Sequence, residues 1–218
     1  MLIWKYIFII INDNNFFSVS PTLHPLICYT IYMKVLTQIK SRQDFRSWLV
    51  KNHATSKECW IYIKRAKPID PNIFYYLDAV EEALCFGWID SIHMKHKNKL
   101  VARFSPRRKN SYWTELNKAR VKRLEKLGLM TDAGRKVLPK QKPYQIDKDV
   151  MNALKQARAW TQFKKFPLLY QRIRSYNVAF YKDKNLDTYH KALKHLITET
   201  KKSKMYGEWN DYGRLLDY

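Results

Sequence analysis

The sequence predicts an α+β protein: a small antiparallel sheet with flanking helices, followed by a C-terminal helical subdomain. Three observations lead to this class. Apolar residues recur at helical spacing on both sides of short alternating segments, two of these segments are separated only by a polar turn, and every periodic segment after Asp147 has helical spacing. Regular alternation of strands and helices, which would indicate a parallel sheet, does not occur.

The first expected elements are a helix and a strand. The stretch SRQDFRSWLVKNH begins with a capping residue, Ser41, and places Phe45, Trp48 and Leu49 on one helical face. A short amphipathic helix is therefore expected. Residues 58–65, ECWIYIKR, are rich in β-branched and aromatic side chains that alternate between two sides. This alternation predicts a strand.

A second helix is expected over residues 76–88, because its apolar side chains recur at spacings of three and four. These side chains are Leu77, Val80, Leu84 and Trp88. The acidic side chains lie elsewhere on the helical wheel and are expected to form a solvated flank rather than a catalytic pair. They are Asp78, Glu81 and Glu82.

Residues 91–103 predict a β-hairpin with a polar turn at residues 97–99, and Pro106 ends its second strand. The next helix is expected to begin at a Ser111 cap and to end at Gly128. Its inward side chains are expected to be Trp113, Leu116, Leu124 and Leu127. A short helical turn at residues 131–138 follows, and residues 140–147 form the expected linker.

Three parts are expected along the chain. Residues 1–32 are apolar without helical period, and Met33 is the expected biological start, so they are interpreted as a non-native or disordered extension. Residues 33–140 form the α+β domain, and residues 147–218 form the helical subdomain. Its helices include a segment starting near Pro167 and a last one with an inward stripe of Leu186, Tyr189, Leu193 and Leu196.

Charge is the strongest global signal. The chain has 41 Lys and Arg against 19 Asp and Glu, a net charge of +22, which favours an anionic partner such as nucleic acid, an anionic membrane surface or a phosphorylated small molecule. The apolar run at residues 6–11 is too short to span a membrane, so no transmembrane segment is expected. Three cysteines without CxxC spacing favour the cytoplasm over a disulfide framework.

The densest basic stretch is RFSPRRKNSYW, which places Arg107 and Arg108 just before an expected helix N-terminus. Arginine forks and free backbone N–H groups both bind anions, and Trp113 offers an aromatic ring. The alternative is a basic loop whose arginine stems pack on aromatic side chains and whose guanidinium groups pair with Asp90 or Glu82.

Other chemistry has little support in the sequence. No phosphate-binding glycine loop and no nucleophile elbow is present, and Cys85 is interpreted as a small buried residue. His93 and His96 lie three residues apart on an expected strand, where they would face opposite sides and could not share a metal ion. Neither a metal nor a cofactor is therefore expected.

Three segments carry a resemblance to a known family: HATSKECWIYIKR, LDAVEEALCFGWIDS and RFSPRRKNSYWTELNKARVKRLEKLGLMTDAG. Over residues 41–138 the chain resembles the YdeI/OmpD-associated, or bacteriocin-protection, family. The resemblance implies a link to protection from bacteriocins or antimicrobial peptides and to an outer-membrane porin, and for some members a periplasmic location. It does not imply an enzyme activity or a cofactor. The residues it marks as characteristic are Trp88, Asp90, Arg107, Arg108, Ser111, Trp113 and Asn117.

Two functional hypotheses follow. In the first, the protein is non-enzymatic and binds an anion in a basic groove: Arg107 and Arg108 contact the anion, Asp90 orients an arginine, and Trp88 and Trp113 wall the groove. In the second, the protein is an enzyme that acts on a small anionic metabolite, with Asp90 as the base beside Arg107 and Arg108.

Overall fold

The computed structural model describes residues 33–108, 111–140 and 143–216. The expected N-terminal extension, residues 1–32, lies outside these ranges. By its internal contacts the chain divides into residues 1–34 and residues 35–218, and the second unit contains every element described below.

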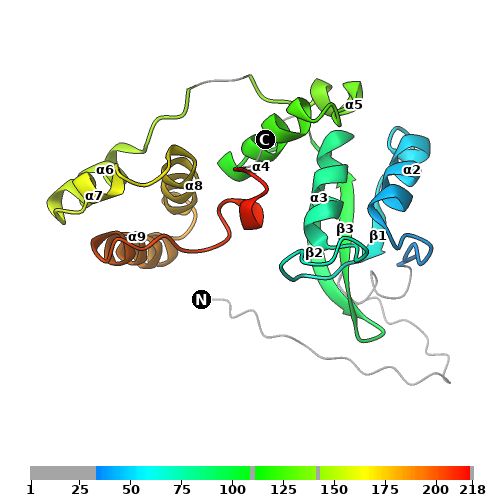
Figure 1. Ribbon diagram of the computed structural model, residues 1–218, viewed down its shortest axis with the longest axis horizontal. Helices are drawn as coiled ribbons and strands as arrows, with labels where there is room; N and C mark the ends of the chain where they lie inside the picture. Colours follow the sequence, from blue (N-terminus) through cyan, green and yellow to red (C-terminus); the bar gives the residue numbers. More distant parts are fainter. Residues whose placement is uncertain (1–32, 109–110, 141–142, 217–218) are drawn as a thin grey trace, which may run out of the picture. The chain divides into compact units, whose positions relative to one another are not determined.

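A three-stranded antiparallel sheet lies at the centre of the α+β part, and the predicted fold class is confirmed (Figure 1). Its strands, in the spatial order β1-β3-β2, are β1 (Cys59–Tyr62), β2 (Trp88–His96) and β3 (Lys99–Pro106). The predicted hairpin is formed by β2 and β3. Lys97 and Asn98 form its turn with positive φ angles of 46° and 59°, and β3 ends at Pro106 as expected.

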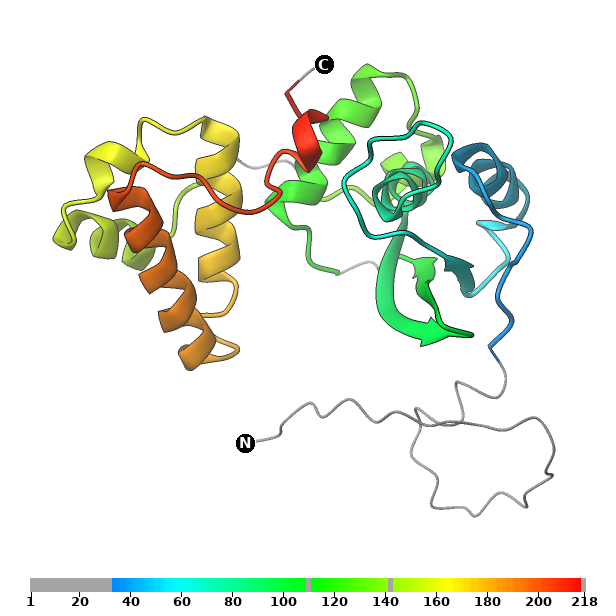
Figure 2. The same ribbon diagram turned by 60° about the horizontal axis from the view of Figure 1, so that its bottom comes forward.

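Helices α2 (Arg42–Asn52) and α3 (Tyr76–Cys85) pack side by side and, with the sheet, enclose the first hydrophobic core (Figure 2). The predicted Ser41 cap is confirmed, since its hydroxyl accepts from the Asp44 backbone N–H while the Asp44 side chain accepts from the Ser41 N–H. Helix α3, however, ends earlier than expected.

The residue that ends the α3 segment is Gly87, which has a φ of +73°. A Cβ there would lie 2.9 Å from a methyl carbon of Val137 and 3.0 Å from the Ala133 carbonyl oxygen, so both the backbone conformation and the space favour glycine. The prediction that Trp88 belongs to the helix is wrong, because the chain reverses at Gly87 and Trp88 begins β2.

Helix α4 (Glu115–Lys126) begins later than expected. Its N-cap is Thr114, whose hydroxyl accepts from the Asn117 N–H at 3.1 Å, so the prediction that Ser111 caps this helix is wrong. The chain ends the helix at the predicted Gly128, with a φ of +67°. Leu127 was expected to face inward but is 46% exposed. The short helix α5 (Asp132–Lys136) follows as predicted.

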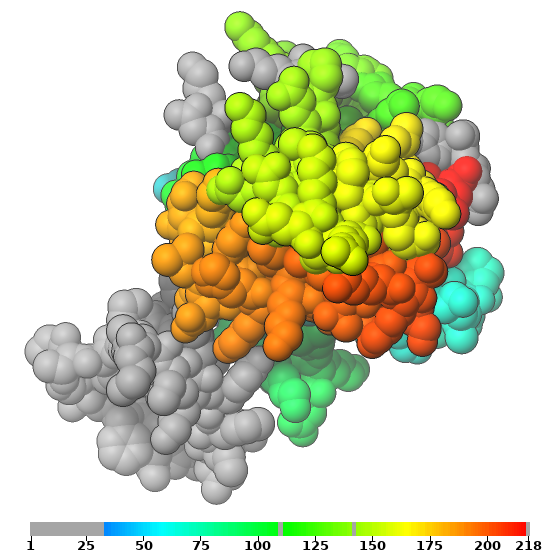
Figure 3. Space-filling model, turned by 90° about the vertical axis from the view of Figure 1, so that its left-hand side faces the viewer, coloured from blue at the N-terminus to red at the C-terminus, as the bar shows by residue number. Residues whose placement is uncertain are grey.

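The C-terminal segment is helical and forms a second hydrophobic cluster. Its elements are α6 (Lys148–Gln156), α7 (Trp160–Phe163), α8 (Leu168–Ala179), α9 (Leu186–Lys201) and the 3₁₀-helix η1 (Asp211–Gly213). Figure 3 shows the face on which the yellow α6–α7 region lies beside the orange α9. Tyr189 and Leu196 are buried as expected, whereas Leu186 is 62% exposed because it starts the helix at its solvent end.

Candidate anion-binding site

Arg107, the central residue of the predicted site, is buried and held by its own neighbours. Its Nη1 donates to the Ser111 hydroxyl and to the Tyr112 carbonyl oxygen, both at 3.1 Å, and its guanidinium carbon lies 3.7 Å from the centre of the Trp113 ring. Burial lowers the pKa of Arg107 to about 10, opposed by the charge of Asp90. Only 7% of Arg107 is exposed. Its contacts with Ser111, Tyr112 and Trp113 therefore stabilise the segment before α4 rather than leave the guanidinium group open to solvent.

Asp90 contacts a phenol and an imidazole. Its Oδ2 accepts from the Tyr76 hydroxyl at 2.6 Å and lies 3.3 Å from His93 Nε2. Strand alternation alone would place Asp90 and His93 on opposite faces, but a β-bulge between them brings both to one side. In the described part of the chain Asp90 forms no ion pair with an arginine, so its expected role of orienting one is not observed; its charge acts on Arg107 only at longer range.

The remaining predicted residues divide between the interior and the surface. Trp88 is 1% exposed and donates its indole N–H to the His53 carbonyl oxygen at 3.2 Å, so it cannot wall an open groove. Asn117 is 8% exposed, and its side-chain oxygen accepts from Arg120 at 2.8 Å. Arg108 is exposed. The structure therefore brings Arg107, Ser111 and Trp113 together, but they pack against one another and do not form an open site.

The acidic residues of α3 are buried, and their prediction as a solvated flank is wrong. Asp78 is 7% exposed, Glu81 0% and Glu82 1%. Each carboxylate binds arginines from other elements, which is what allows it to be charged without water. We call this cluster the acid–arginine network. It consists of Asp78, Glu81 and Glu82 with Arg42, Arg46, Arg123 and Arg214.

Glu81 is the centre of the acid–arginine network. Its Oε2 lies 2.7 Å from Arg42 of α2 and 3.1 Å from Arg214 of the C-terminal tail, while its Oε1 lies 2.9 Å from Arg123 of α4. The charges of Glu81 and Glu82 raise the pKa of Arg42 against the effect of its burial. The network therefore connects three helices and the tail.

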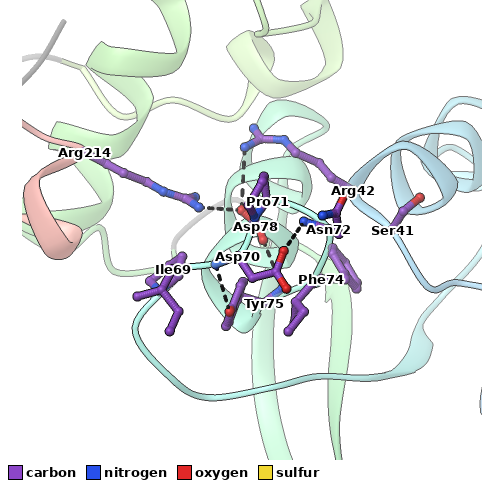
Figure 4. Close-up of a pocket in the computed structure, with 12 residues that line it drawn as sticks. Ser41, Arg42, Ile69, Asp70, Pro71, Asn72, Phe74, Tyr75, Asp78 and Arg214 are labelled. Atoms are coloured by element: carbon purple, nitrogen blue, oxygen red, sulfur yellow. Dashed lines mark hydrogen bonds and ion pairs between the residues drawn. The ribbon is translucent and has the colours of Figure 1, made fainter.

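A cavity of about 380 Å³ adjoins this network, and Figure 4 shows the residues that line it. Arg42 and Arg214 reach one side of it, and Ile69 and Phe74 belong to its apolar side. Most guanidinium nitrogens of the two arginines are already used, because Arg214 Nη2 lies 2.7 Å from Asp78 Oδ1 and Arg42 binds both glutamates, although Arg42 Nη2 is buried and has no hydrogen-bond partner among the described residues. Because Asp70 and Asp78 also line the cavity, it is a poor anion site despite its two arginines.

A second, larger hollow has the opposite character. Its volume is about 890 Å³, and it lies where β1 and the turn of the β2–β3 hairpin meet the segment before α2. We call it the lysine hollow, because four of its lining residues are lysines and none is acidic. The lysines are Lys40, Lys64, Lys97 and Lys99, and Tyr62 and Phe74 also line it.

The four lysines are exposed, and in the described part of the chain none of them belongs to an ion pair. Lys99 Nζ lies 5.8 Å from the Tyr62 ring centre and Lys64 Nζ lies 5.7 Å from the Tyr75 ring centre, so their stems cover aromatic rings while their charges stay in water. The nearby Asp44 has a lowered pKa, chiefly because it accepts a hydrogen bond from the Lys40 backbone N–H. The charge of the Lys40 side chain contributes least to this lowering.

The lysine hollow was not predicted from the sequence. The predicted basic site was at the arginines before α4, whereas Lys40 and Lys64 precede Arg107 by more than forty residues. The pairing of β1 with β3 is what brings Lys64 beside the hairpin turn. The turn lysines were visible in the sequence, but they were interpreted only as turn residues.

The two described cysteines are buried. Cys85 is fully buried, and burial raises its pKa to about 12, which agrees with its interpretation as a buried, unreactive residue. Cys59 is likewise buried, with a pKa raised to about 12. Among the described residues, no group of three or more His, Cys, Asp or Glu side chains is placed to hold a metal ion.

The fold and the lysine hollow define an α+β protein with a basic surface depression whose described lining residues include no carboxylate. Residues 37–137 are similar to a protein family described as a domain of unknown function, DUF8412, and this stretch contains the whole sheet and helices α2 to α5. No curated protein and no solved structure matches the chain. Within the described ranges, every helix is too short or too polar to cross a membrane.

Proposed function

We propose that this protein is a non-enzymatic binding protein, similar to the YdeI/OmpD-associated family, and that the lysine hollow binds its anionic partner. One observation carries the proposal: four exposed lysines line one depression, and none of the described residues that line it has a carboxylate. Positive charges close together repel one another, and an anion bound between them lowers this electrostatic energy. A concave surface also concentrates the positive potential.

Arg107 is a less suitable anion site than the lysine hollow. It is only 7% exposed, it stacks on Trp113, and its Nη1 already donates to Ser111 and Tyr112, so little of its guanidinium group can reach a phosphate or a carboxylate. The four lysines of the hollow are exposed and, among the described residues, form no ion pair. Arg108, which is exposed, stays in the proposal as a peripheral contact.

The test is a double substitution, Lys64→Gln with Lys99→Gln, followed by measurement of heparin binding at several salt concentrations. We expect affinity to fall by about tenfold or more, and its salt dependence to become shallower, because fewer counterions are displaced. The matched control is Lys155→Gln with Lys165→Gln, which changes the net charge equally at exposed positions of the C-terminal segment. If the two double variants weaken binding equally, only net charge matters and the hollow is not the site.

A second candidate function is an enzyme that acts on a small anionic metabolite. The contact of Asp90 with Tyr76 and His93 favours it, because a carboxylate beside a phenol and an imidazole could move a proton. The test is turnover of small phosphorylated and carboxylated metabolites by the native protein and by Asp90→Asn. A loss of roughly 100-fold or more in a folded variant would support the role, and turnover at the native rate would exclude it.

A further inference from the structure

We infer that the anionic partner is double-stranded DNA, bound through its phosphate backbone, and that Lys97 at the hairpin turn contacts it although lysine destabilises that turn. This inference rests on the proposed function and specifies its partner. Three observations support it: the backbone conformation of the turn, the shape of the hairpin, and the kinds of side chain that the hollow lacks.

The backbone conformation at Lys97 is unusual for lysine. His96 pairs with Lys99 across the hairpin, so Lys97 and Asn98 form a two-residue turn, and both have positive φ angles, 46° and 59°. Asn, Asp and Gly are the residues that favour such turns, and Asn98 fits this preference. Lys97 does not. A residue found where its conformation is unfavourable points to a function of its side chain. Here the side chain places an ammonium group at the end of the hairpin.

The tip of the β2–β3 hairpin extends beyond β1 (Figure 1). Strand β1 pairs with residues Val101–Phe104 of β3, and the Ile63 N–H still donates to the Leu100 carbonyl oxygen, whereas the pairing of β2 with β3 continues to His96 and Lys99. The B-DNA major groove, about 12 Å wide, admits a two-stranded ribbon, while the deep and narrow major groove of A-form RNA does not. Lys40 and Lys64, from outside the hairpin, then lie beside it to contact the phosphates at the groove edge.

The side chains of the lysine hollow argue against two other partners. Binding to a membrane surface combines basic residues with exposed apolar side chains that insert. In the hollow, Ile39, Ile63 and Phe74 are each at least 91% buried, and Leu100 is half-buried. Single strands are bound by exposed aromatic rings that stack on bases. Tyr62 is half-buried and its hydroxyl lies 2.9 Å from His96 Nδ1, so it is a poor stacking platform. Of the anionic partners considered, a nucleic-acid duplex bound through its phosphate backbone therefore fits the hollow best.

The decisive variant is Lys97→Asn, because asparagine favours the left-handed conformation and removes the charge. We expect its melting temperature to rise by roughly 1–3 °C. We expect affinity for a short, labelled DNA duplex of mixed sequence to fall about threefold to tenfold, with the slope of log affinity against log salt shallower by about 0.9. Weaker binding by a more stable protein cannot be attributed to unfolding.

Two further variants serve as controls. Lys97→Arg keeps the charge and should bind the duplex within about twofold of the native protein, since the phosphate contact persists. Lys165→Asn makes the same chemical change in another exposed turn and should also leave duplex affinity unchanged. Full-strength duplex binding by Lys97→Asn, or equal losses for Lys97→Asn and Lys165→Asn, would overturn the role of Lys97.

The identity of the partner is tested with three competing probes at the same salt concentration. They are single-stranded DNA of the same length, an RNA duplex, and vesicles of phosphatidylcholine with phosphatidylserine. Tighter binding to the DNA duplex than to each of them supports the inference, and equal or tighter binding to any one overturns it. If that happens while heparin binding still depends on Lys64 and Lys99, the proposed anion site stands and only the partner is wrong. If heparin binding ignores those lysines, the proposed function itself fails.

Discussion

The acid–arginine network and the lysine hollow use positive charge in opposite ways. In the network, four arginines from three elements surround three carboxylates, of which Glu81 and Glu82 are almost fully buried. In the hollow, four exposed lysines share a depression with no acidic lining residue. The net charge of +22 does not distinguish these uses. What distinguishes them is whether each cation has a partner within the fold.

The choice of residue matches each use. The arginine guanidinium is planar, weakly hydrated and able to bind two carboxylate oxygens at once, so it suits a buried ion pair. Arg120 shows this geometry, with Nε 2.7 Å and Nη2 2.8 Å from the two oxygens of the buried Asp211. The lysine ammonium is compact and strongly hydrated, and so stays at the surface, where it can exchange water for a phosphate.

The largest expected effect is that of Glu81→Gln on stability. The substitution keeps the shape of the side chain but removes the charge that pairs with Arg42, Arg123 and Arg214. Four guanidinium groups then face two carboxylates in the interior, and breaking a buried pair in this way costs about 3–5 kcal/mol. Urea unfolding of the variant and the native protein measures the change in the free energy of unfolding.

The control for that measurement is Glu125→Gln, the same chemical change at a partly exposed ion pair. Glu125 lies 2.9 Å from Arg135, and their side chains are 34% and 46% exposed. Solvent and salt screen such a pair, so its loss should cost about 1 kcal/mol or less. Equal costs for Glu81→Gln and Glu125→Gln would show that the network is not a special determinant of the fold.

Local sequence signals predicted much of the fold. The Ser41 cap, the polar hairpin turn and the helix stop at Gly128 depend on residues within a few positions of one another, and the structure has all three, although the turn is formed by Lys97 and Asn98 while Lys99 begins β3. The burial of Glu81 could not be predicted in this way. Its partners come from positions 42, 123 and 214, and only the assembled tertiary structure brings them together.

The candidate site likewise depends on contacts between residues that are distant in the sequence. The sequence placed Arg107 near Trp113 and raised the alternative that arginine stems pack on aromatic rings; the 3.7 Å stacking distance supports that alternative. It also expected Asp90 to pair with an arginine, but an unforeseen β-bulge turns Asp90 toward His93 instead. The lysine hollow depends on long-range strand pairing, so its lysines could be counted from the sequence but not grouped.

The smallest expected effect sharpens the comparison most. Lys64→Gln with Lys99→Gln should change the free energy of unfolding by no more than about 0.5 kcal/mol, because these exposed side chains form no ion pair in the described part of the chain. Removing two like charges from one depression could even stabilise the fold slightly. Urea unfolding checks this, and a loss approaching that of Glu81→Gln would mean that the lysines are structural. A protein that keeps its stability but loses heparin affinity would instead separate the cations that hold the fold from those that bind the partner.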